Sequence, residues 1–339
     1  MRQQARIVDV AALAGVSAGT ASKALNNTGQ LSPATRDRVR RAAEQLGFTP
    51  DTRGRALSSG RTYTVALLTT DSSGRFSIPI TRGVEDVLSA GELATILCDT
   101  RDDPLREQHY LRSLIARRVD GIVVTGRRTE PREPIDVPRA RRGSVPGDLL
   151  LPVVYALAAS TDPDDASVIV DDAGGAASVV THLRGLGRSR IAHVTGPANH
   201  RSATERAKAV AEAAGPAFVG EPLFGEWSER WGRQSVDLLL RSGPDAITCG
   251  SDQLARGVCD RLRELGKSVP VDVAVTGYDN WSVMAEASRP PLTTVDLQLE
   301  ELGRRTATLL LDAIAGDPHH GVLELPTHLI PRESTLGTS

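Results

Sequence analysis

The chain has 339 residues, a formal net charge of −2 at pH 7 and 40% hydrophobic content. This length predicts two or three domains, and no apolar run approaches the roughly 18 residues of a membrane span or the apolar stretch of a secretion signal. The three isolated cysteines (Cys98, Cys249 and Cys259) form no C-x-x-C pair, which argues against a disulfide framework and a zinc module. Such sparse cysteines favour a reduced, cytoplasmic protein. We expect neither a metal nor another cofactor.

The charge is distributed unevenly along the chain. Residues 1–62 contain nine Arg and one Lys against four acidic residues, a net charge of +6. The rest of the chain contains 30 basic and 38 acidic residues, a net charge of −8. A basic N-terminal segment on an acidic body favours a polyanion-binding head, although chance asymmetry on solvated surfaces would give the same count.

Three short helices are predicted in the basic segment, over residues 7–14, 18–25 and 33–46. The inner face of the first is predicted to carry Val10, Leu13 and Ala14. Ser17 is a natural N-cap for the second, and Ser32 followed by Pro33 begins the third. Two short helices joined by a glycine-containing turn are typical of a helix-turn-helix, although any small helical bundle would also fit this spacing.

The stretch from Asp9 to Gly60 closely resembles the N-terminal module of the LacI/GalR family of transcriptional regulators. The matching residues are Asp9-Val10-Ala11, Ala14-Gly15-Val16-Ser17, Thr20, Ser22, Leu25-Asn26, Ser32, Thr35-Arg36, Leu46-Gly47-Phe48 and Pro50, in order and without gaps. The resemblance implies that the second helix enters the major groove of DNA. The residues it places at the DNA are Ser17, Ala18, Gly19, Thr20, Ser22, Lys23, Asn26, Arg55 and Leu57.

The first residues of the second helix read base edges in that family. Ala18 and Gly19 stand there in this chain, and neither side chain offers a hydrogen-bonding pair to a base. We therefore expect direct readout to depend on Lys23. Thr20, Ser22 and Asn26 are expected at phosphates or adjacent bases, where phosphate contacts position the protein without reading sequence.

Residues 51–62 resemble the hinge helix and linker of the family, with Arg55 and Leu57 in its core. The segment from Asp51 to Ser58 is too short for a stable isolated helix, for which about 12–15 residues are marginal, so order only on DNA is physically reasonable. The resemblance implies that Leu57 enters the minor groove as a wedge and kinks the site. A flexible linker without this role is the alternative.

From Thr64 onward, apolar strands alternate with helices. Strands are predicted over 65–68, 95–98, 121–124, 152–155, 167–170, 190–194, 246–248 and 273–275, with helices including 80–90 and 105–117. Such continuous apolar runs favour parallel sheets covered on both faces. The number of units predicts two similar lobes, and residues 126–150, rich in Arg and Pro, are predicted to be irregular.

No catalytic motif stands out in the chain. The G-x-S-x-G elbow, the P-loop and H-E-x-x-H are all missing from the sequence. His193 lies in an apolar strand, where a satisfied core histidine is the better interpretation. The sequence therefore predicts a protein that is not an enzyme.

The body also resembles the effector-binding core of the same family, whose fold is similar to that of periplasmic sugar-binding proteins. Its landmarks include "HLRGLGRSRIAHVTGP" (182–197), "SDQLARGV" (251–258) and "VPVDVAVTGYDN" (269–280). The resemblance places the ligand in a cleft between the lobes. The residues it implies there are Asp71, Phe76, Ser202, Arg206, Trp227, Ser251 and Asp279.

An arginine and an aspartate can share hydrogen bonds with neighbouring hydroxyls, and an indole face can pack on the C–H face of a pyranose. The alternatives are a surface ion pair for Arg206, a core aromatic for Trp227 and a turn residue for Asp279. Leu157 and Ser251 depart from the residues usual in the family. They leave the exact ligand open, with a carbohydrate favoured over a nucleobase.

The predicted fold class is α/β, with an all-α helix-turn-helix head and a two-lobed, periplasmic-binding-protein-like core of parallel sheets. The predicted domains are a DNA-binding head (1–50), a hinge helix and linker (51–62) and an effector-binding and dimerisation domain (63–339). The resemblance implies a homodimeric, ligand-responsive repressor on a palindromic operator in double-stranded DNA, with no membrane partner. A sugar receptor for a transporter and an enzyme with an appended DNA-binding module are the rivals.

Overall fold

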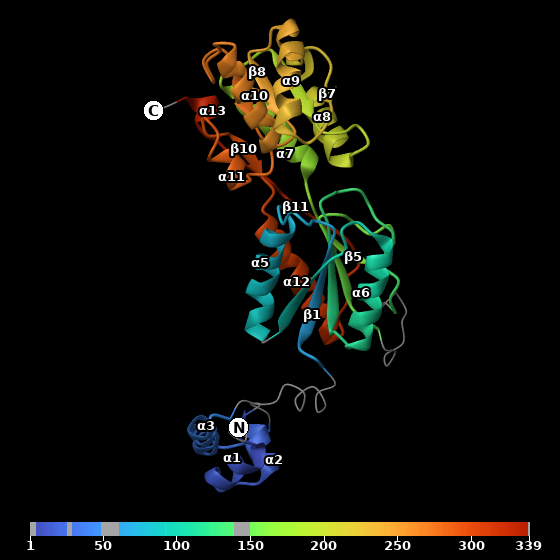
Figure 1. Ribbon diagram of the computed structural model, residues 1–339, viewed down its shortest axis with the longest axis vertical. Helices are drawn as coiled ribbons and strands as arrows, with labels where there is room; N and C mark the ends of the chain where they lie inside the picture. Colours follow the sequence, from blue (N-terminus) through green and yellow to red (C-terminus); the bar gives the residue numbers. More distant parts are fainter. Residues whose placement is uncertain (1–4, 26–28, 49–60, 92, 139–149, 338–339) are drawn as a thin grey trace. The chain divides into compact units, whose positions relative to one another are not determined.

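The computed structural model describes residues 5–25, 29–48, 61–91, 93–138 and 150–337. The chain divides into two compact units, Met1–Tyr63 and Thr64–Ser339 (Figure 1). Asn26, Arg55 and Leu57, three of the residues predicted at the DNA, lie outside the described residues, as does the hinge from 51 to 60.

The first unit contains the three predicted helices. They are α1 (Ile7–Ala14), α2 (Ala18–Leu25) and α3 (Pro33–Leu46). Both predicted N-caps are confirmed: the hydroxyl oxygens of Ser17 and Ser32 each accept a hydrogen bond from the backbone N–H three residues on, at 3.1 and 3.2 Å. Gly15 and Gly47 end α1 and α3 with φ of 64° and 59°, a conformation that favours glycine.

The inner face of α1 differs from the predicted one. Val10, Ala11 and Ala14 are buried, whereas Leu13 is 50% exposed. At roughly 100° per residue, Val10, Ala11 and Ala14 fall within one arc of about 100°, and Leu13 lies about 60° beyond it. Packing against α2 and α3 covers that arc and leaves Leu13 at its margin.

The first lobe of the second unit consists of residues 64–170 and 299–325 around a six-stranded parallel sheet. Its strand order is β11-β5-β4-β3-β1-β2. The strands are β1 (Thr64–Thr69), β2 (Ala94–Asp99), β3 (Gly121–Thr125), β4 (Val153–Ala156), β5 (Ala166–Val170) and β11 (Gly321–Leu325). The described part of the predicted irregular stretch 126–150 contains no helix and no strand, which agrees with that prediction.

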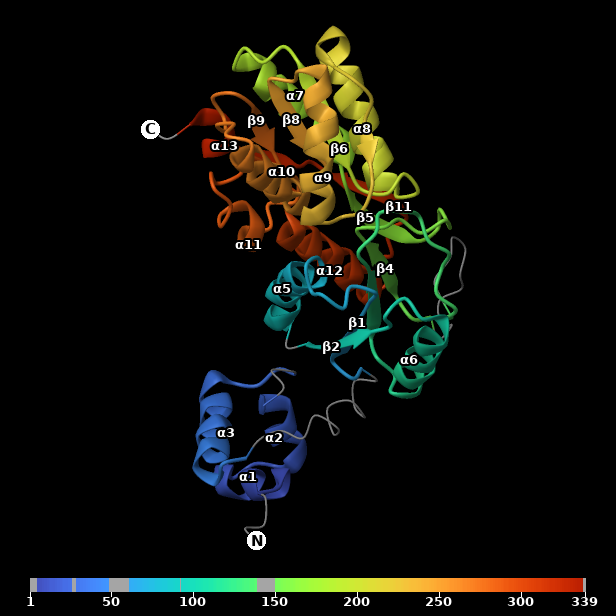
Figure 2. The same cartoon turned by 45° about the horizontal axis from the view of Figure 1, so that its top comes forward.

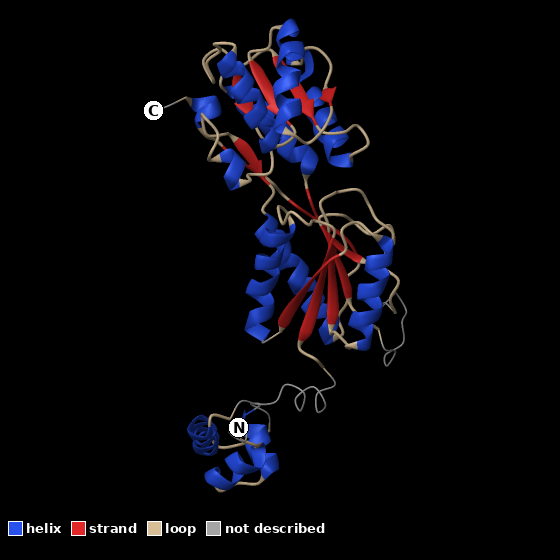
Figure 3. Ribbon diagram, viewed as in Figure 1, coloured by secondary structure: helices blue, strands red, loops and turns tan. Residues whose placement is uncertain are grey.

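Helices cover both faces of this sheet (Figures 1 and 3). They are α5 (Ser77–Leu88) and α12 (Leu299–Ala315) on one face and α6 (Pro104–Ala116) on the other, with the short η1 (Ser89–Gly91) after α5. In β1, Val65 and Leu67 belong to the cluster packed against α5 and α12. Ala66 and Leu68 belong to the cluster that includes Leu111 of α6. Both faces of the strand are therefore buried, as its continuous apolar run predicts.

Helices α5 and α12 lie side by side in close backbone contact (Figure 2). A Cβ atom at Gly83 of α5 would overlap the carbonyl oxygen of Glu300, and one at Gly303 of α12 would overlap the carbonyl oxygen of Ile80. Glycine at both positions therefore lets the two backbones approach each other more closely than any side chain would allow.

We expect Gly83→Ala to lower the free energy of unfolding of the second unit by about 1–3 kcal/mol or more, because the added methyl meets backbone rather than a movable side chain. The matched control is Gly185→Ala, a helical glycine whose Cβ would lie in open space, where alanine should stabilise by about 0.5 kcal/mol. Urea denaturation measures both. Equal effects of the two variants would contradict the close approach.

The second lobe consists of residues 171–298 and 326–337 around a four-stranded parallel sheet of order β7-β6-β8-β9. Its strands are β6 (Ile191–Thr195), β7 (Leu223–Phe224), β8 (Ala246–Cys249) and β9 (Ala274–Thr276), with an antiparallel pair of β10 (Thr294–Asp296) and β12 (His328–Ile330). Its helices are α7 (Asp172–Gly185), α8 (Arg201–Ala214), η2 (Gly215–Ala217), α9 (Glu229–Leu239), η3 (Leu240–Ser242), α10 (Asp252–Glu264), α11 (Ser282–Ala285) and α13 (Glu333–Leu336).

The chain passes between the lobes three times, after β5, β10 and β11 (Figure 3). The predicted two lobes of parallel sheet are therefore confirmed, but β7, β10, β11 and β12 were not predicted. These strands have two to five residues, too few for a clear period. The predicted strand over 95–98 lies at a sheet edge, where Ile96 and Leu97 are 38% and 52% exposed.

Within the described residues, no helix is long and apolar enough to cross a bilayer. The same residues contain no group of three or more His, Cys, Asp and Glu side chains arranged to hold a metal ion. Cys98, Cys249 and Cys259 are buried and free. His193 is also buried and bonds Thr248 through Nδ1 at 2.8 Å, while its Nε2 has no hydrogen-bond partner among the described atoms, so it is only half satisfied.

Candidate functional site

Helix α2 of the first unit presents small residues and one cation. Ser17, Ala18, Gly19 and Lys23 are exposed, and no residue of α2 is acidic. The half-buried Thr20 exchanges a 2.9 Å hydrogen bond with Ser17 through the two hydroxyls, so this pair also fixes the start of the helix. The beginning of α2 therefore allows close approach of another surface, with Lys23 one turn further on.

A cavity of about 290 Å³ lies between the two lobes of the second unit. All seven residues predicted at the effector line it: Asp71, Phe76, Ser202, Arg206, Trp227, Ser251 and Asp279. Leu157, which departs from the family pattern, lines it too. The lining residues that were not predicted are Ser73, Arg75, Arg127, Arg128, Thr129, His200, Gln253 and Leu297.

Asp71 holds the loop between β1 and α5 in shape. Its carboxylate accepts hydrogen bonds from the backbone N–H groups of Phe76 and Ser77 at 2.7 and 2.9 Å and from the Ser73 hydroxyl at 2.6 Å. Burial raises the pKa of Asp71, but these hydrogen bonds outweigh it and bring the pKa below the ordinary 3.8. The carboxylate therefore fixes Phe76 at the cavity wall.

We expect Asp71→Asn to cost about 1.5–3 kcal/mol of stability at pH 7, because charge-assisted hydrogen bonds to the loop are lost. A folded-state pKa below the unfolded one gives stability that is present above the unfolded pKa and lost as the pH falls through the folded pKa. The difference between wild type and variant should therefore shrink below about pH 4. Urea denaturation at pH 7 and pH 3 measures it, and a pH-independent difference would contradict the role of the charge.

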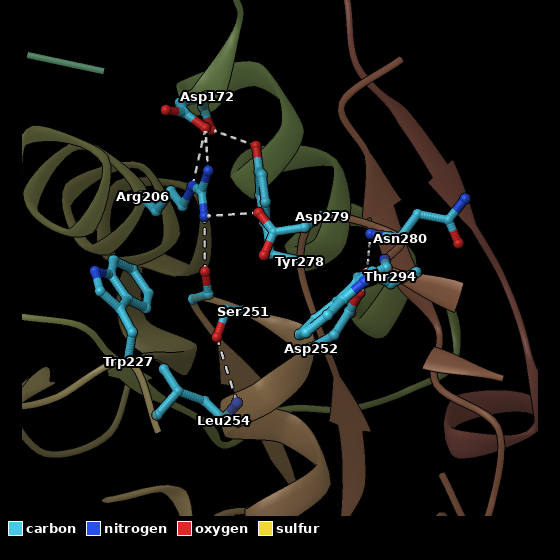
Figure 4. Close-up of polar contacts among 12 residues, drawn as sticks. Asp172, Arg206, Trp227, Ser251, Asp252, Leu254, Tyr278, Asp279, Asn280 and Thr294 are labelled. Atoms are coloured by element: carbon cyan, nitrogen blue, oxygen red, sulfur yellow. Dashed lines mark hydrogen bonds and ion pairs between the residues drawn. The ribbon is translucent and has the colours of Figure 1, made fainter. Parts of the chain in front are cut away.

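Arg206 of α8 is the centre of a buried ionic cluster (Figure 4). Its Nε and Nη2 donate to Asp172 at 2.9 and 2.7 Å, and its Nη1 donates to the Gly250 carbonyl at 2.7 Å. Asp279 lies 3.5 Å from Nη1. Burial lowers the pKa of Arg206, but Asp172 and Asp279 outweigh it and raise the pKa, so the guanidinium is charged.

Arg206 is only 5% exposed, so the alternative of a surface ion pair is wrong. Its guanidinium also lies 3.7 Å from the centre of the Tyr278 ring, and the Tyr278 hydroxyl donates to the Asp172 carbonyl at 2.9 Å. Sequence reasoning missed Asp172. The available signal was a pair of acids that directly follows a buried parallel strand, where functional side chains gather.

Asp279 joins the two lobes. Arg75 of the first lobe forms an ion pair with its second carboxylate oxygen, and the Arg75 guanidinium also faces the rings of Phe76 and Trp281 at 5.1 and 4.9 Å. Asp279 has a φ of 103°, a strained value for a residue with a side chain, and its N–H donates to Val295 at 2.8 Å. Asp279 is thus a turn residue, as the alternative interpretation expects, and its charged side chain also lines the cavity.

Trp227 closes another side of the cavity. Its Nε1–H donates to Nδ1 of His200 at 2.8 Å, which assigns the neutral tautomer of His200 with its proton on Nε2, because an indole N–H only donates. The indole ring lies against Gly196, where a Cβ would overlap it. Trp227 also packs on the core of the second lobe, as the core-aromatic interpretation expects, while its contact with a ligand stays a prediction.

Three further lining residues, Ser251, Ser202 and Leu157, come from two helix starts and one strained turn. Ser251 is buried and caps α10, where its hydroxyl accepts from the Leu254 N–H at 3.3 Å. Ser202 lies in the first turn of α8. Leu157 is buried with a φ of 73°, a conformation that costs energy for a branched side chain and is held by the packing around it.

Comparisons with known proteins agree with this architecture. The family described as bacterial regulatory proteins, lacI family, matches residues 6–51, and a periplasmic binding protein-like domain matches residues 180–335. The chain is 33% identical over 347 residues to the HTH-type transcriptional regulator CelR of Thermobifida fusca, covering 98% of this chain and 99% of that relative.

Two solved structures extend the comparison. The complex of the transcriptional regulator CelR with cellobiose superimposes with a TM-score of 0.64 at 30% identity and covers 98% of this chain and 100% of that one. The lac repressor dimer bound to operator and the anti-inducer ONPF superimposes with a TM-score of 0.75 at 24% identity, covering 98% and 99%, and supports the fold alone. The chain belongs to the lacI family of bacterial DNA-binding transcriptional regulators.

Proposed function

We propose that the chain is a repressor whose affinity for its operator is controlled by a small ligand, a carbohydrate, bound between the two lobes of the core. The observation that carries this proposal is that all seven side chains implied by the family resemblance line one cavity between the two lobes. Residues 1–50 form the DNA-binding head, 51–62 the hinge and 63–339 the effector-binding and dimerisation domain.

The composition of the cavity supports a carbohydrate. Its volume of about 290 Å³ is near the lower limit of small-molecule sites, which run from roughly 300 to 1,000 Å³. The Trp227 indole offers an apolar face for the C–H groups of a pyranose, while Ser202 and Gln253 add neutral hydrogen-bonding groups. The cellobiose complex of CelR adds support from a relative.

On the DNA side, the basic head supplies the electrostatic attraction and α2 the groove contact. We propose that Ser17, Ala18 and Gly19 allow close approach and that Lys23 reads a base edge. Thr20, Ser22 and Asn26 would contact phosphates or adjacent bases. In a homodimer, two heads bind the half-sites of a palindromic operator, and Arg55 and Leu57 of the ordered hinge lie at its minor groove.

The interlobe contacts suggest how the ligand acts. Arg75 and Asp279 join the lobes directly beside the cavity, and three chain segments connect the lobes. A ligand that contacts both walls binds one arrangement of the lobes better than another, and this differential affinity shifts the equilibrium between them. In the proposed mechanism, that shift changes the spacing of the two hinges and with it the affinity for the operator.

The experiment begins with an operator selected from a randomised pool of palindromic DNA. Fluorescence anisotropy then measures the affinity of the full chain for it with and without a panel of mono- and disaccharides. We expect salt-dependent binding of a palindrome and a change of about tenfold or more with at least one sugar. Failure to enrich any palindrome, even at low salt, would contradict the repressor assignment.

A further inference from the structure

We propose that the ligand of the interlobe cavity carries an anionic group, a phosphate ester or a carboxylate, and that Arg127 and Arg128 bind it. This inference rests on the proposed function and narrows the class of carbohydrate from neutral sugars to sugar phosphates and sugar acids. Its ground is the difference between the charged side chains of the cavity lining that have hydrogen-bond or ion-pair partners in the described structure and those that have none there.

The two carboxylates of the lining already have partners. Asp71 is held by four protein donors between Ser73 and the start of α5. Asp279 is held by Arg75 from one lobe and Arg206 from the other. A neutral sugar is rich in hydroxyl donors, for which carboxylates are the strongest acceptors, and here it would have to compete for both of them.

Of the four arginines that line the cavity, two pair with a carboxylate in the part of the chain that the structure describes and two do not. Arg206 is paired with Asp172 and Arg75 with Asp279. Arg127 and Arg128 follow β3 directly, at the carboxyl end of the first-lobe sheet, and both are exposed. Among the described residues, neither has a hydrogen-bond or ion-pair partner, so the cavity has two uncompensated positive charges at this wall.

Further polar atoms at the cavity lack partners. The Nε–H of Arg75 and the hydroxyl of Thr129 are buried and have no hydrogen-bond partner among the described atoms. Thr129 belongs to the same loop as the two arginines. A phosphate or carboxylate has several anionic acceptor oxygens, so its hydrogen bonds with these donors are charge-assisted and stronger than those that a neutral sugar hydroxyl would accept.

The positive charges of Arg127 and Arg128 also act on His200, which lines the cavity from the second lobe. Burial lowers the pKa of His200, and the cations of Arg128 and Arg127 lower it further, against the opposing effect of Glu130. Glu130 itself accepts a hydrogen bond from the Arg201 N–H at 2.7 Å. The neutral His200 and the indole of Trp227 thus form an uncharged side of the cavity, and we assign the anion to the arginine loop.

The test uses the full chain and a matched panel. Glucose, galactose, fructose and cellobiose are each offered as the neutral sugar, as a phosphate ester and as a sugar acid, with inorganic phosphate as a further probe. Isothermal titration at 50 and 300 mM salt measures affinity. We expect an anionic member to bind at least about tenfold more tightly than its neutral parent, with a preference that weakens at high salt.

Two variants locate the effect. Arg127→Gln with Arg128→Gln should remove the anionic preference, a loss of about tenfold or more, and leave affinity for the neutral parent within about twofold. Arg112→Gln is the control, since Arg112 is an exposed arginine of the same lobe on α6 that does not line the cavity. It should change neither affinity. Comparing the affinities for the phosphate ester and for the sugar acid of the same sugar shows which anionic group is bound.

Several results would overturn the inference: tighter binding of a neutral sugar than of all its anionic forms, an anionic preference that survives in the double variant, or inorganic phosphate binding as tightly as any sugar phosphate. Binding of neutral sugars alone would leave the proposed carbohydrate response intact. If no sugar, neutral or charged, binds or alters operator affinity, both the inference and the proposed function are wrong.

Discussion

Replacing Arg206 by Met is expected to destabilise the second unit by about 3–5 kcal/mol, the cost of leaving a buried charge without its partner. Methionine fills the site only about as far as the arginine Nε; it leaves Asp172 without the hydrogen bonds from Nε and Nη2, and Asp279 with Arg75 alone. Urea denaturation of the full chain, followed by tryptophan fluorescence, measures the loss.

The matched control adds Asp172→Asn to Arg206→Met. Replacing the unpaired Asp172 carboxylate by a neutral amide should restore at least half of the lost stability, because the unpaired charge and not the shape of methionine causes the loss. The single variant should also recover on acidification: burial raises the pKa of Asp172, and protonation below that pKa removes the charge. No recovery in the double variant or in acid would contradict the ionic cluster as the source of the stability.

Trp227→Ala is expected to weaken ligand binding by about 2 kcal/mol or more, roughly thirtyfold, since an aromatic side chain that packs on a ligand is a typical hot spot. Operator binding without ligand should be unchanged, because the head is a separate compact unit. Titration calorimetry with the sugar found in the panel measures the first expectation, and anisotropy with the selected operator measures the second.

Trp227→Phe separates the two contributions of this residue. Phenylalanine keeps an aromatic face but cannot donate to His200, so we expect it to retain most of the ligand affinity if the ring face is what the ligand contacts. A loss as large as that of the alanine variant would assign the effect to the hydrogen bond. An unchanged affinity in Trp227→Ala would remove the residue from the ligand site.

Local signals explain why the head could be predicted from sequence. Ser17 and Ser32 cap helices through the backbone three residues on, and Gly15 and Gly47 end them in a left-handed conformation. These interactions span a few residues and depend only on residue type and spacing. The error at Leu13 arose because the covered arc of a helix is set by its neighbours.

The interlobe cavity was predicted only in part, for a physical reason. Asp71, Phe76 and the other expected residues follow strands or begin helices at positions that the family resemblance marks. Two of the residues that were missed, Arg75 and Asp172, depend on pairing between distant segments: Arg75 meets Asp279 across 204 positions, and Asp172 meets Arg206 across 34. No local pattern encodes such a pair. For the same reason β11, which joins the first-lobe sheet from near the end of the chain, was not foreseen.

The central claim is that a ligand in the interlobe cavity controls the affinity for DNA, and thermodynamic linkage tests it most directly. Titration calorimetry gives the ligand affinity of the free chain and of the chain saturated with the selected operator, and anisotropy gives the operator affinity with and without saturating ligand. The two ratios must be equal, and a tenfold change corresponds to about 1.4 kcal/mol of coupling. We predict equal ratios that differ from one by about tenfold or more in wild type. An operator affinity that saturating ligand leaves unchanged in wild type would contradict the account.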